Sequence, residues 1–300
     1  MDVISFAQNF EDVMLYRVFR DRPTGFYIDV GAADPVHHSV TKWFYDLGWS
    51  GINIEPRQAF FEALRRERTR DNNLNCGAGA ESGEAVFYEL SHTHQWSSFD
   101  DAVRVAAAKH DETIVEHTMR ICTLNEIIER HAPGRPIDFL KIDVEGWEQQ
   151  VLRGLDLTRH RPTILIVEAT HQGTPEQNDA KWEHILTEAG YHCVYFDGLN
   201  KFYVEGGRRD LARYFTLPPN VFDDITVYSL ETASLSAQLR ESEADRAARL
   251  EVIKSLDADC AARLEVIKSL EVNREELAER LQKLLASPIV RFWDKLILRS

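Results

Sequence analysis

Short runs of β-branched and aromatic residues alternate with amphipathic segments from residue 26 to about residue 166. This alternation is typical of strand–helix units that build a parallel sheet. The strands that it predicts are 26–30, 51–55, 74–77, 137–143 and 163–168. Two more, 191–196 and 201–204, flank a turn-forming stretch and predict a hairpin. We therefore expect an α/β, Rossmann-like fold with a seven-stranded, mostly parallel sheet and an antiparallel C-terminal hairpin.

Two segments depart from this alternation. Residues 7–19 place Phe10, Val13, Met14 and Val18 on one side of a predicted helix, which we interpret as a packing helix. Residues 92–118 show no strand pattern. They include His92, His94, Gln95, Trp96, Ser97 and Ser98. This segment is either an insertion that faces the substrate or a solvated loop with a helix.

The character of the chain changes after residue 230. Glycine disappears, and residues 248–256 recur unchanged as residues 262–270, two heptads later. Apolar residues at steps of three, four or seven form one stripe: Ile253, Leu256, Cys260, Ile267, Leu270, Leu277, Leu281 and Leu284. The pattern predicts one domain over 1–230, a long helix or coiled coil over 231–286, and a short amphipathic segment over 287–300.

Two interpretations of the long helix remain open at this point. Arg263 and Arg274 interrupt the stripe, as they would in a helix laid along the first domain. The sustained period favours a coiled coil, so we expect a homo-oligomer that forms through this helix. For residues 287–300 simple helix docking is favoured over weak peripheral contact with a membrane.

The chain is acidic, with a formal net charge of −14, and nearly all of that charge falls in residues 1–230. An acidic domain repels a phosphate backbone, which argues against nucleic acid as the substrate. The four cysteines show no spacing suited to zinc. No secretion leader or membrane span is visible, so we expect a soluble, cytoplasmic protein with reduced thiols.

Small and acidic residues follow the first two predicted strands. Asp29, Gly31, Ala33 and Asp34 occupy the turn after the first strand, where small residues let a ligand approach the backbone. Acidic groups there would repel a diphosphate but favour the ammonium and sulfonium of S-adenosylmethionine. Asp29 has a second interpretation as a turn or cap residue. Glu55 follows Gly31 by 24 residues, close to the offset at which a carboxylate accepts hydrogen bonds from ribose hydroxyls.

The fourth and fifth predicted strands bring further acids to the same sheet edge. Asp143 and Glu145 follow the fourth strand, and Glu168 and His171 end the fifth. Such groups can act as a general base for a hydroxyl, as orienting acceptors or as metal ligands. Lys141 is best interpreted as one half of a structural ion pair.

These residues and motifs resemble the FkbM-type methyltransferases, which use S-adenosylmethionine and have the class I fold. The similarity spans residues 5–228 and is most distinctive over residues 139–146, Phe-Leu-Lys-Ile-Asp-Val-Glu-Gly. It implies that Asp29, Gly31 and Glu55 contact the cofactor and that Asp143 and Glu145 line the reaction centre. Ala33 stands where many members have asparagine, which leaves a side-chain contact there in doubt.

The resemblance implies an O-methyltransferase. Members with a stretch like residues 197–203 often accompany surface-polysaccharide biosynthesis, so a sugar hydroxyl is the leading acceptor, with a small-molecule natural product as an alternative. Asp143 is the first candidate for the general base, and Glu145 and His171 are the alternatives. A divalent metal is the less favoured way to activate the hydroxyl. The rival functions are a Rossmann dehydrogenase, disfavoured by the missing glycine pattern, and a non-catalytic assembly module organised by its coiled coil.

Overall fold

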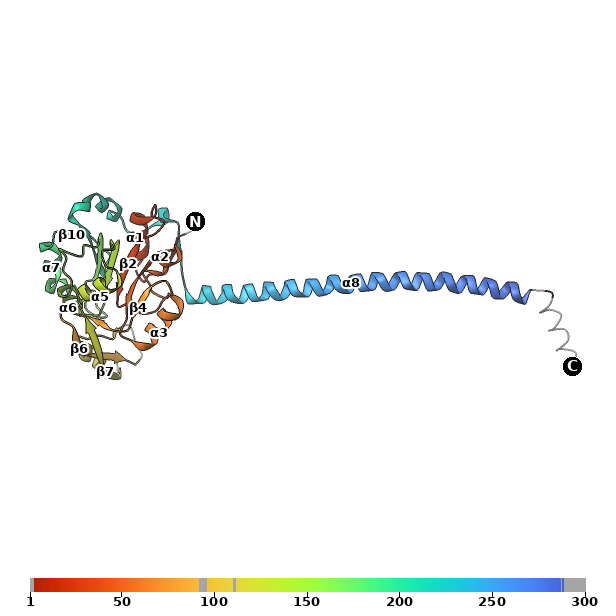
Figure 1. Cartoon of the computed structure of the whole chain (residues 1–300), viewed down its shortest axis with the longest axis horizontal. Coiled ribbons are helices and arrows are strands. Elements are labelled where there is room, and N and C mark those ends of the chain that lie inside the picture. The colour runs from red at the N-terminus through yellow and green to blue at the C-terminus, as the bar shows by residue number, and fades with distance from the viewer. Residues whose placement is uncertain (1–2, 92–95, 110–111, 287, 289–300) are drawn as a thin grey trace. The chain divides into compact units, whose positions relative to one another are not determined.

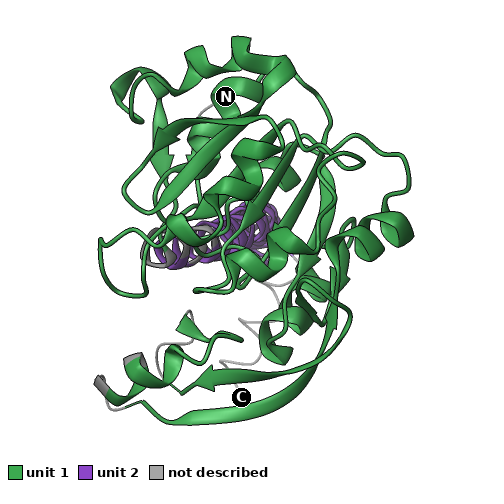
Figure 2. Cartoon of the chain, turned by 90° about the vertical axis from the view of Figure 1, so that its left-hand side faces the viewer, with its two compact units in different colours: residues 1–230 green, residues 231–300 purple. Residues whose placement is uncertain are grey.

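The chain divides into two compact units, residues 1–230 and residues 231–300 (Figure 2). The computed structural model describes residues 3–91, 96–109, 112–286 and 288. Every sheet of these described residues lies in unit 1, whereas the described part of unit 2 is helical (Figure 1). No helix of the described residues is both long enough and apolar enough to cross a membrane.

Seven strands form the central sheet of unit 1. They are β2 (Phe26–Val30), β3 (Ser50–Ile54), β4 (Asn72–Leu74), β8 (Phe139–Ile142), β9 (Ile164–Glu168), β10 (Tyr191–Phe196) and β11 (Asn200–Glu205). Their order is β10-β11-β9-β8-β2-β3-β4. The pairs from β4 to β9 are parallel, while β11 is antiparallel to β9 and β10 is antiparallel to β11. The predicted α/β fold with a mostly parallel sheet is therefore confirmed.

The central strands are buried on both faces, as is typical of parallel strands. Ile28 of β2 belongs to the apolar core on one face, and its neighbour Tyr27 belongs to the core on the other face. Asp29 is the register partner of Lys141 in β8. Because side chains alternate along a strand, these two polar residues share the face of Tyr27. Both are buried, so they need one another as partners.

Helices and short 3-10 segments connect the strands. The α-helices of unit 1 are α1 (Glu11–Phe19), α2 (Lys42–Asp46), α3 (Gln58–Glu67), α4 (Val103–Lys109), α5 (Leu124–His131), α6 (Glu148–Arg153) and α7 (Glu183–Glu188). The 3-10 segments are η2 (Asp179–Lys181), η3 (Gly206–Phe215) and η4 (Val221–Asp223). Residues of α5 and α6 pack in one core, and residues of α1 pack in the other.

A second sheet has three strands in the order β5-β7-β6, with β6 and β7 labelled in Figure 1. They are β5 (Gly77–Ala78), β6 (Gly83–Leu90) and β7 (Ile114–Cys122). The prediction of one strand over 74–77 is wrong, because the chain leaves the central sheet after β4 and enters the second sheet at β5. The prediction of no strand in 92–118 is wrong for β7. Most of β7 is exposed, so it lacks the apolar alternation of a half-buried strand.

The two ends of unit 1 are paired. Strand β1 (Val3–Ser5) lies parallel to β12 (Ile225–Val227). The predicted helix over 7–19 begins only at Glu11, because the Asp12 carboxylate accepts hydrogen bonds from the backbone N–H groups of Phe6 and Ala7 and holds them outside the helix.

Unit 2 contains one long helix, α8 (Leu230–Leu285). The long helix predicted for the tail is thus present, while its pairing in a coiled coil stays a prediction. The apolar residues of its stripe, including Ile253 and Ile267, are exposed in the single chain. The segment predicted over 287–300 lies outside the described residues apart from residue 288.

Candidate functional site

A cavity of about 510 Å³ opens at the carboxyl edge of the parallel strands. One wall comes from the strand ends: Gly31 follows β2, Glu55 follows β3, Asp143 and Glu145 follow β8, and Glu168 ends β9. Strand β2 has β3 on one side and β8 on the other, so the strand order reverses there. Ligands of open α/β sheets bind at such a reversal.

Aromatic side chains form another part of the cavity lining. Phe87 of β6, Trp96, Phe99 and Trp147 all line the cavity. The ring centroid of Phe99 lies 4.9 Å from that of Phe87 and 6.1 Å from that of Trp147. The second sheet therefore builds part of the cavity.

The structure bears on the two interpretations of residues 92–118. Trp96, Ser97 and Ser98 line the cavity. His92, His94 and Gln95 lie outside the described residues. Residues 96–99 thus face the cavity, whereas the described residues 100–109 and 112–118 are not among those that line it.

Gly31 lies where the loop after β8 crosses the end of β2. Its φ is +77°, and a Cβ added there would lie 1.9 Å from the backbone oxygen of Asp143. The Gly31 N–H donates to the carbonyl of Ile54 at 3.0 Å. Glycine at this position thus lets the ends of β2, β3 and β8 converge on the cavity.

Glu55 faces this turn from β3. Its Oε2 accepts a hydrogen bond from the Ala33 N–H, and its Oε1 accepts one from the Arg57 N–H, both at 2.8 Å. Ala33, with a φ of +49°, also lines the cavity. Burial raises the pKa of Glu55 to about 7. The structure therefore brings together Gly31, Ala33 and Glu55, three of the residues predicted to bind the cofactor.

Asp29 lies beneath the cavity and is not among the described residues that line it. It is 1% exposed, accepts a hydrogen bond from Thr41 Oγ1 at 3.2 Å, and lies 3.5 Å from Lys141 Nζ. The same ammonium lies 3.3 Å from Asp143 and donates to the Gly31 carbonyl at 3.1 Å. Burial alone would lower the pKa of Lys141, but the charges of Asp143 and Asp29 outweigh it and raise that pKa. Asp29 thus positions Lys141, which confirms the ion pair expected for the lysine.

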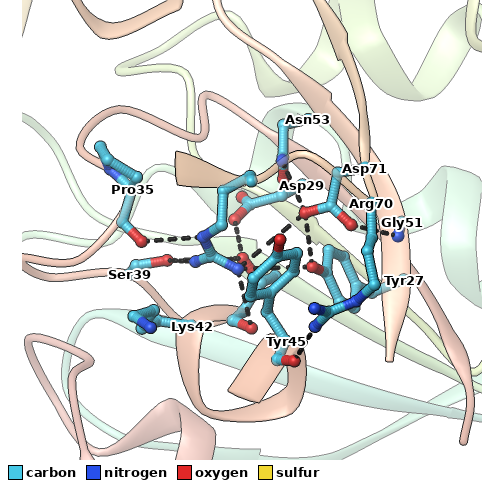
Figure 3. Close-up of polar contacts among 12 residues, drawn as sticks. Tyr27, Asp29, Pro35, Ser39, Lys42, Tyr45, Gly51, Asn53, Arg70 and Asp71 are labelled. Carbon is cyan, nitrogen blue, oxygen red and sulfur yellow. Dashed lines mark hydrogen bonds and ion pairs between the residues drawn. The ribbon is translucent and has the colours of Figure 1, made fainter. Parts of the chain in front are cut away.

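A buried polar network supports the strand that carries Asp29 (Figure 3). The Arg68 side chain, 1% exposed, donates to the Pro35 carbonyl at 2.9 Å and to Ser39 Oγ at 2.8 Å. Asp71 accepts from the Tyr27 hydroxyl at 2.7 Å and lies 3.9 Å from the Arg68 guanidinium. This network fixes the loop after β2 against its neighbouring strands.

Asp34 has a structural role in that loop. Its Oδ1 accepts hydrogen bonds from the N–H groups of Val36 and His37, both at 2.8 Å. Asp34 is not among the described residues that line the cavity. These hydrogen bonds to the backbone two and three residues further along stabilise the turn that begins at Asp34. They explain an aspartate at this position without a ligand.

Three carboxylates meet at the floor of the cavity. One oxygen from each of Asp143, Glu145 and Glu168 lies within 4.8 Å of the other two. Glu168 is 5% exposed, and its Oε2 has no hydrogen-bond partner among the described residues. Burial raises the pKa values of Glu145 and Glu168 well above the ordinary value of a glutamate, and the negative charges of the neighbouring carboxylates raise them further.

Glu148 fixes the loop that presents this group. Its Oε1 accepts from the Gly146 N–H at 2.9 Å and from the Val144 N–H at 3.3 Å. Glu145 has a φ of +55° and Gly146 a φ of +99°. The tight turn directs Glu145 back towards the strand ends.

His171 does not join the carboxylates. It is exposed and is not among the described residues that line the cavity. Its N–H donates to the carbonyl of Glu176, and its own carbonyl accepts from the Thr174 N–H. Gly173, Thr174 and Pro175 of the same loop line the cavity, so the loop conformation, and not nearness to Glu168 in sequence, decides which residues reach it.

Sequence reasoning named Trp96 in a segment that could face the substrate, but it missed Phe87, Phe99, Trp147 and Arg57. The Arg57 guanidinium lies beside the cavity and pairs with Glu89 of β6 at 2.6 Å. Trp147 stands next to the distinctive stretch 139–146, which could have drawn attention to it. Nothing in the local sequence of Phe87 or Phe99 signals the cavity, because their place depends on the second sheet.

Comparison with known proteins agrees with this geometry. The model of the methyltransferase FkbM domain matches residues 29–193, a little more than half of the chain. The matched segment includes Gly31, Glu55 and all three carboxylates of the cavity. A search of curated proteins finds no significant match. The chain belongs to the methyltransferase family defined by the FkbM domain.

Proposed function

We propose that this methyltransferase takes its methyl group from S-adenosylmethionine and transfers it to a hydroxyl oxygen of a sugar. One observation carries the proposal: Glu55 and the three carboxylates line a single cavity on either side of Gly31. The order of the sheet, with its antiparallel C-terminal hairpin, is the one we expect of the class I methyltransferase fold.

The residues around Gly31 suit the donor. Gly31 itself lines the cavity, so its backbone is within reach of a ligand at the strand end. Each Glu55 oxygen bonds to one backbone N–H and keeps a further lone pair, so the carboxylate can accept from ribose hydroxyls. A carboxylate there would repel a phosphorylated ribose.

Asp143 is the group that we assign to proton transfer. When bound, S-adenosylmethionine supplies an electrophilic methyl group carried by a sulfonium. Asp143 lines the cavity, with its side chain one-third exposed, and would accept the proton of the acceptor hydroxyl. Lys141, which also lines the cavity, has its ammonium 3.3 Å from this carboxylate and holds it in place. The raised pKa of Glu145 and of Glu168 makes these two weaker candidates at neutral pH.

Two observations support a sugar as acceptor. The stretch 197–203 resembles that of members linked to surface polysaccharides. It forms the β10–β11 turn and the first part of β11, and Leu199 of the turn lines the cavity. The faces of Trp96 and Trp147 offer apolar surface beside polar groups, which suits an amphipathic ring.

Calorimetric titration of the full chain with S-adenosylmethionine and, separately, with NAD tests the donor assignment. We expect micromolar binding of S-adenosylmethionine, a loss of at least about tenfold in Glu55→Ala, and no change in Glu62→Ala, which removes an exposed glutamate from α3. Binding of NAD alone would favour a dehydrogenase. Binding of neither ligand would favour a non-catalytic assembly module.

A further inference from the structure

We propose that Asp143, Glu145 and Glu168 form a binding site for one divalent cation of the Mg²⁺ or Mn²⁺ type. Each residue offers a carboxylate oxygen, and these oxygens lie within 4.8 Å of one another. Glu168 ends β9, and Asp143 and Glu145 follow the neighbouring parallel strand β8, so the sheet fixes the points from which these ligands project. A cation could therefore bind without a large rearrangement of the backbone.

The unpaired oxygen of Glu168 is an independent observation that points to a ligand. Glu168 is only 5% exposed and lines the cavity. Its Oε2 nevertheless has no hydrogen-bond partner among the described residues. A buried carboxylate oxygen without a donor is costly. The nearby ammonium of Lys141 already contacts Asp29, Asp143 and the Gly31 carbonyl. A cation would supply the positive charge that Glu168 lacks.

The ligand atoms indicate the class of cation. All three are carboxylate oxygens, which are hard ligands that Mg²⁺, Mn²⁺ and Ca²⁺ prefer. Three protein ligands leave coordination positions open towards the cavity, as is usual for Mg²⁺ sites that also hold water or substrate. Glu148 steadies the loop of Glu145 through its two backbone hydrogen bonds and would keep that ligand in place.

The cation site can exist whether or not the proposed function is correct. A role of the cation in methyl transfer, however, rests on the proposed function. Within that function one oxygen of Asp143 would bind the cation, and its other oxygen would remain available to accept the proton of the hydroxyl. The cation would then offset the negative charge of the three carboxylates beside the acceptor.

Titration of the metal-free full chain with Mn²⁺, followed by calorimetry and by the electron paramagnetic resonance signal of free Mn²⁺, tests the site in the absence of any methyl donor. We expect one saturable site in the wild type, at least about tenfold weaker binding in Glu168→Gln, and wild-type binding in Glu176→Gln. Glu176 is an exposed acid outside the cavity lining and serves as the matched control. Circular dichroism checks that each variant is folded.

Absence of saturable binding in the folded wild type, or equal affinity in wild type and Glu168→Gln, would overturn the proposal. If Glu168→Gln does not fold, Glu145→Gln takes its place with the same expected loss. The donor titration is separate. Mn²⁺ binding without S-adenosylmethionine binding would reject the proposed function and keep the cation site, and the reverse result would reject the cation site alone.

Discussion

Gly31 combines a left-handed backbone with a close approach of two chain segments. Alanine at a positive φ costs about 1 kcal/mol or more through backbone strain alone. At Gly31 the added Cβ would also overlap the Asp143 carbonyl. We expect Gly31→Ala to lower the free energy of unfolding by at least about 3 kcal/mol in urea titrations.

Gly134 provides the control for this substitution. It has a φ of +67°, and a Cβ there would meet no atom within 4 Å. Gly134→Ala should therefore cost only about 1 kcal/mol. Equal losses in the two variants would show that the crossing of the β8 loop over Gly31 does not constrain residue 31.

Glu55 predicts a pH dependence of donor binding. Burial raises its pKa to about 7, so the carboxyl becomes neutral as the pH falls below that value. Ribose hydroxyls bind the ionised form better, and the affinity of the wild type should fall by about tenfold per pH unit below 7. Calorimetry from pH 5.5 to 8.5 measures it. Glu55→Gln should bind the donor more weakly, with an affinity that no longer depends on pH. If the affinity of the wild type does not change with pH, ionised Glu55 does not bind the donor.

Asp143 predicts a separation of binding from turnover. If it accepts the proton, Asp143→Asn should abolish methyl transfer while the affinity for the donor stays within about tenfold of the wild type. A transfer assay and a donor titration on the same protein test this. An equal loss of both would assign Asp143 to donor binding.

The sequence predicted residues at strand ends better than residues within strands or loops. Gly31 and Glu55 follow adjacent parallel strands, so their meeting follows from topology alone. Asp29 lies inside β2, so the alternation of side chains along the strand places it on one face of the sheet and not at the sheet edge. His171 depends on a loop conformation, and the unpaired Glu168 oxygen depends on every neighbour in space, so neither could be predicted from local pattern.

The strands differ in how readily they can be predicted from their sequences. Strands β2, β8 and β9 are buried on both faces and show as mostly apolar runs, which Asp29 interrupts in β2 and Lys141 in β8. The β6–β7 ribbon is largely exposed, and its pairing comes from residues about thirty positions apart, as in Phe87 with His117. Burial, more than strand propensity, made an element visible in the sequence.

Helix α8 has regular ion pairs along its surface but no described partner for its apolar stripe. Arg249 pairs with Asp245 and Arg263 with Asp259, both at 2.8 Å and both one turn apart. Such pairs add only a few tenths of a kcal/mol each, which is little for a helix of 56 residues. We therefore propose that two or more copies of the chain associate through the stripe.

Charges placed in the stripe test this association. The double substitution Ile253→Asp and Ile267→Asp should shift the chain to a monomer in sedimentation equilibrium, because it buries carboxylates in the interface. Ser255→Asp and Ser269→Asp add the same charges two residues further along in the same repeats, away from the stripe. The serine variant should keep the wild-type mass. A monomeric wild type would contradict the proposal.

Buried acids make the stability of the whole molecule depend on pH. Burial raises the pKa of Glu11 to about 7 from 4.5 and that of Asp12 to about 6 from 3.8. The folded state therefore holds protons that the unfolded state releases. The stabilisation that protonated Glu11 and Asp12 give the folded state is complete below about pH 4 and is lost as the pH rises to about 7. For Glu11 the loss in the free energy of unfolding is about 3 kcal/mol.

Urea unfolding between pH 5 and 7.5 measures this slope. The free energy of unfolding should fall with rising pH in the wild type and fall less in Glu11→Gln. Glu205 has a lowered pKa because Arg161 donates to it, so Glu205→Gln should leave the slope unchanged in this window. A flat profile in the wild type would show that Glu11 and Asp12 are not shifted in this direction.

The pairing of β1 with β12 has a consequence for synthesis on the ribosome. Val3 meets Ile225 and Ser5 meets Val227, and Arg17 of α1 binds Asp223 through two hydrogen bonds. Strand β1 of the nascent chain must therefore wait until almost the whole of unit 1 has been made before its partner strand emerges. Until then the apolar cluster around Phe6 and Trp43 stays incomplete and open to chaperones. A translational pause within α8 would give the domain time to close before chains meet through their tails.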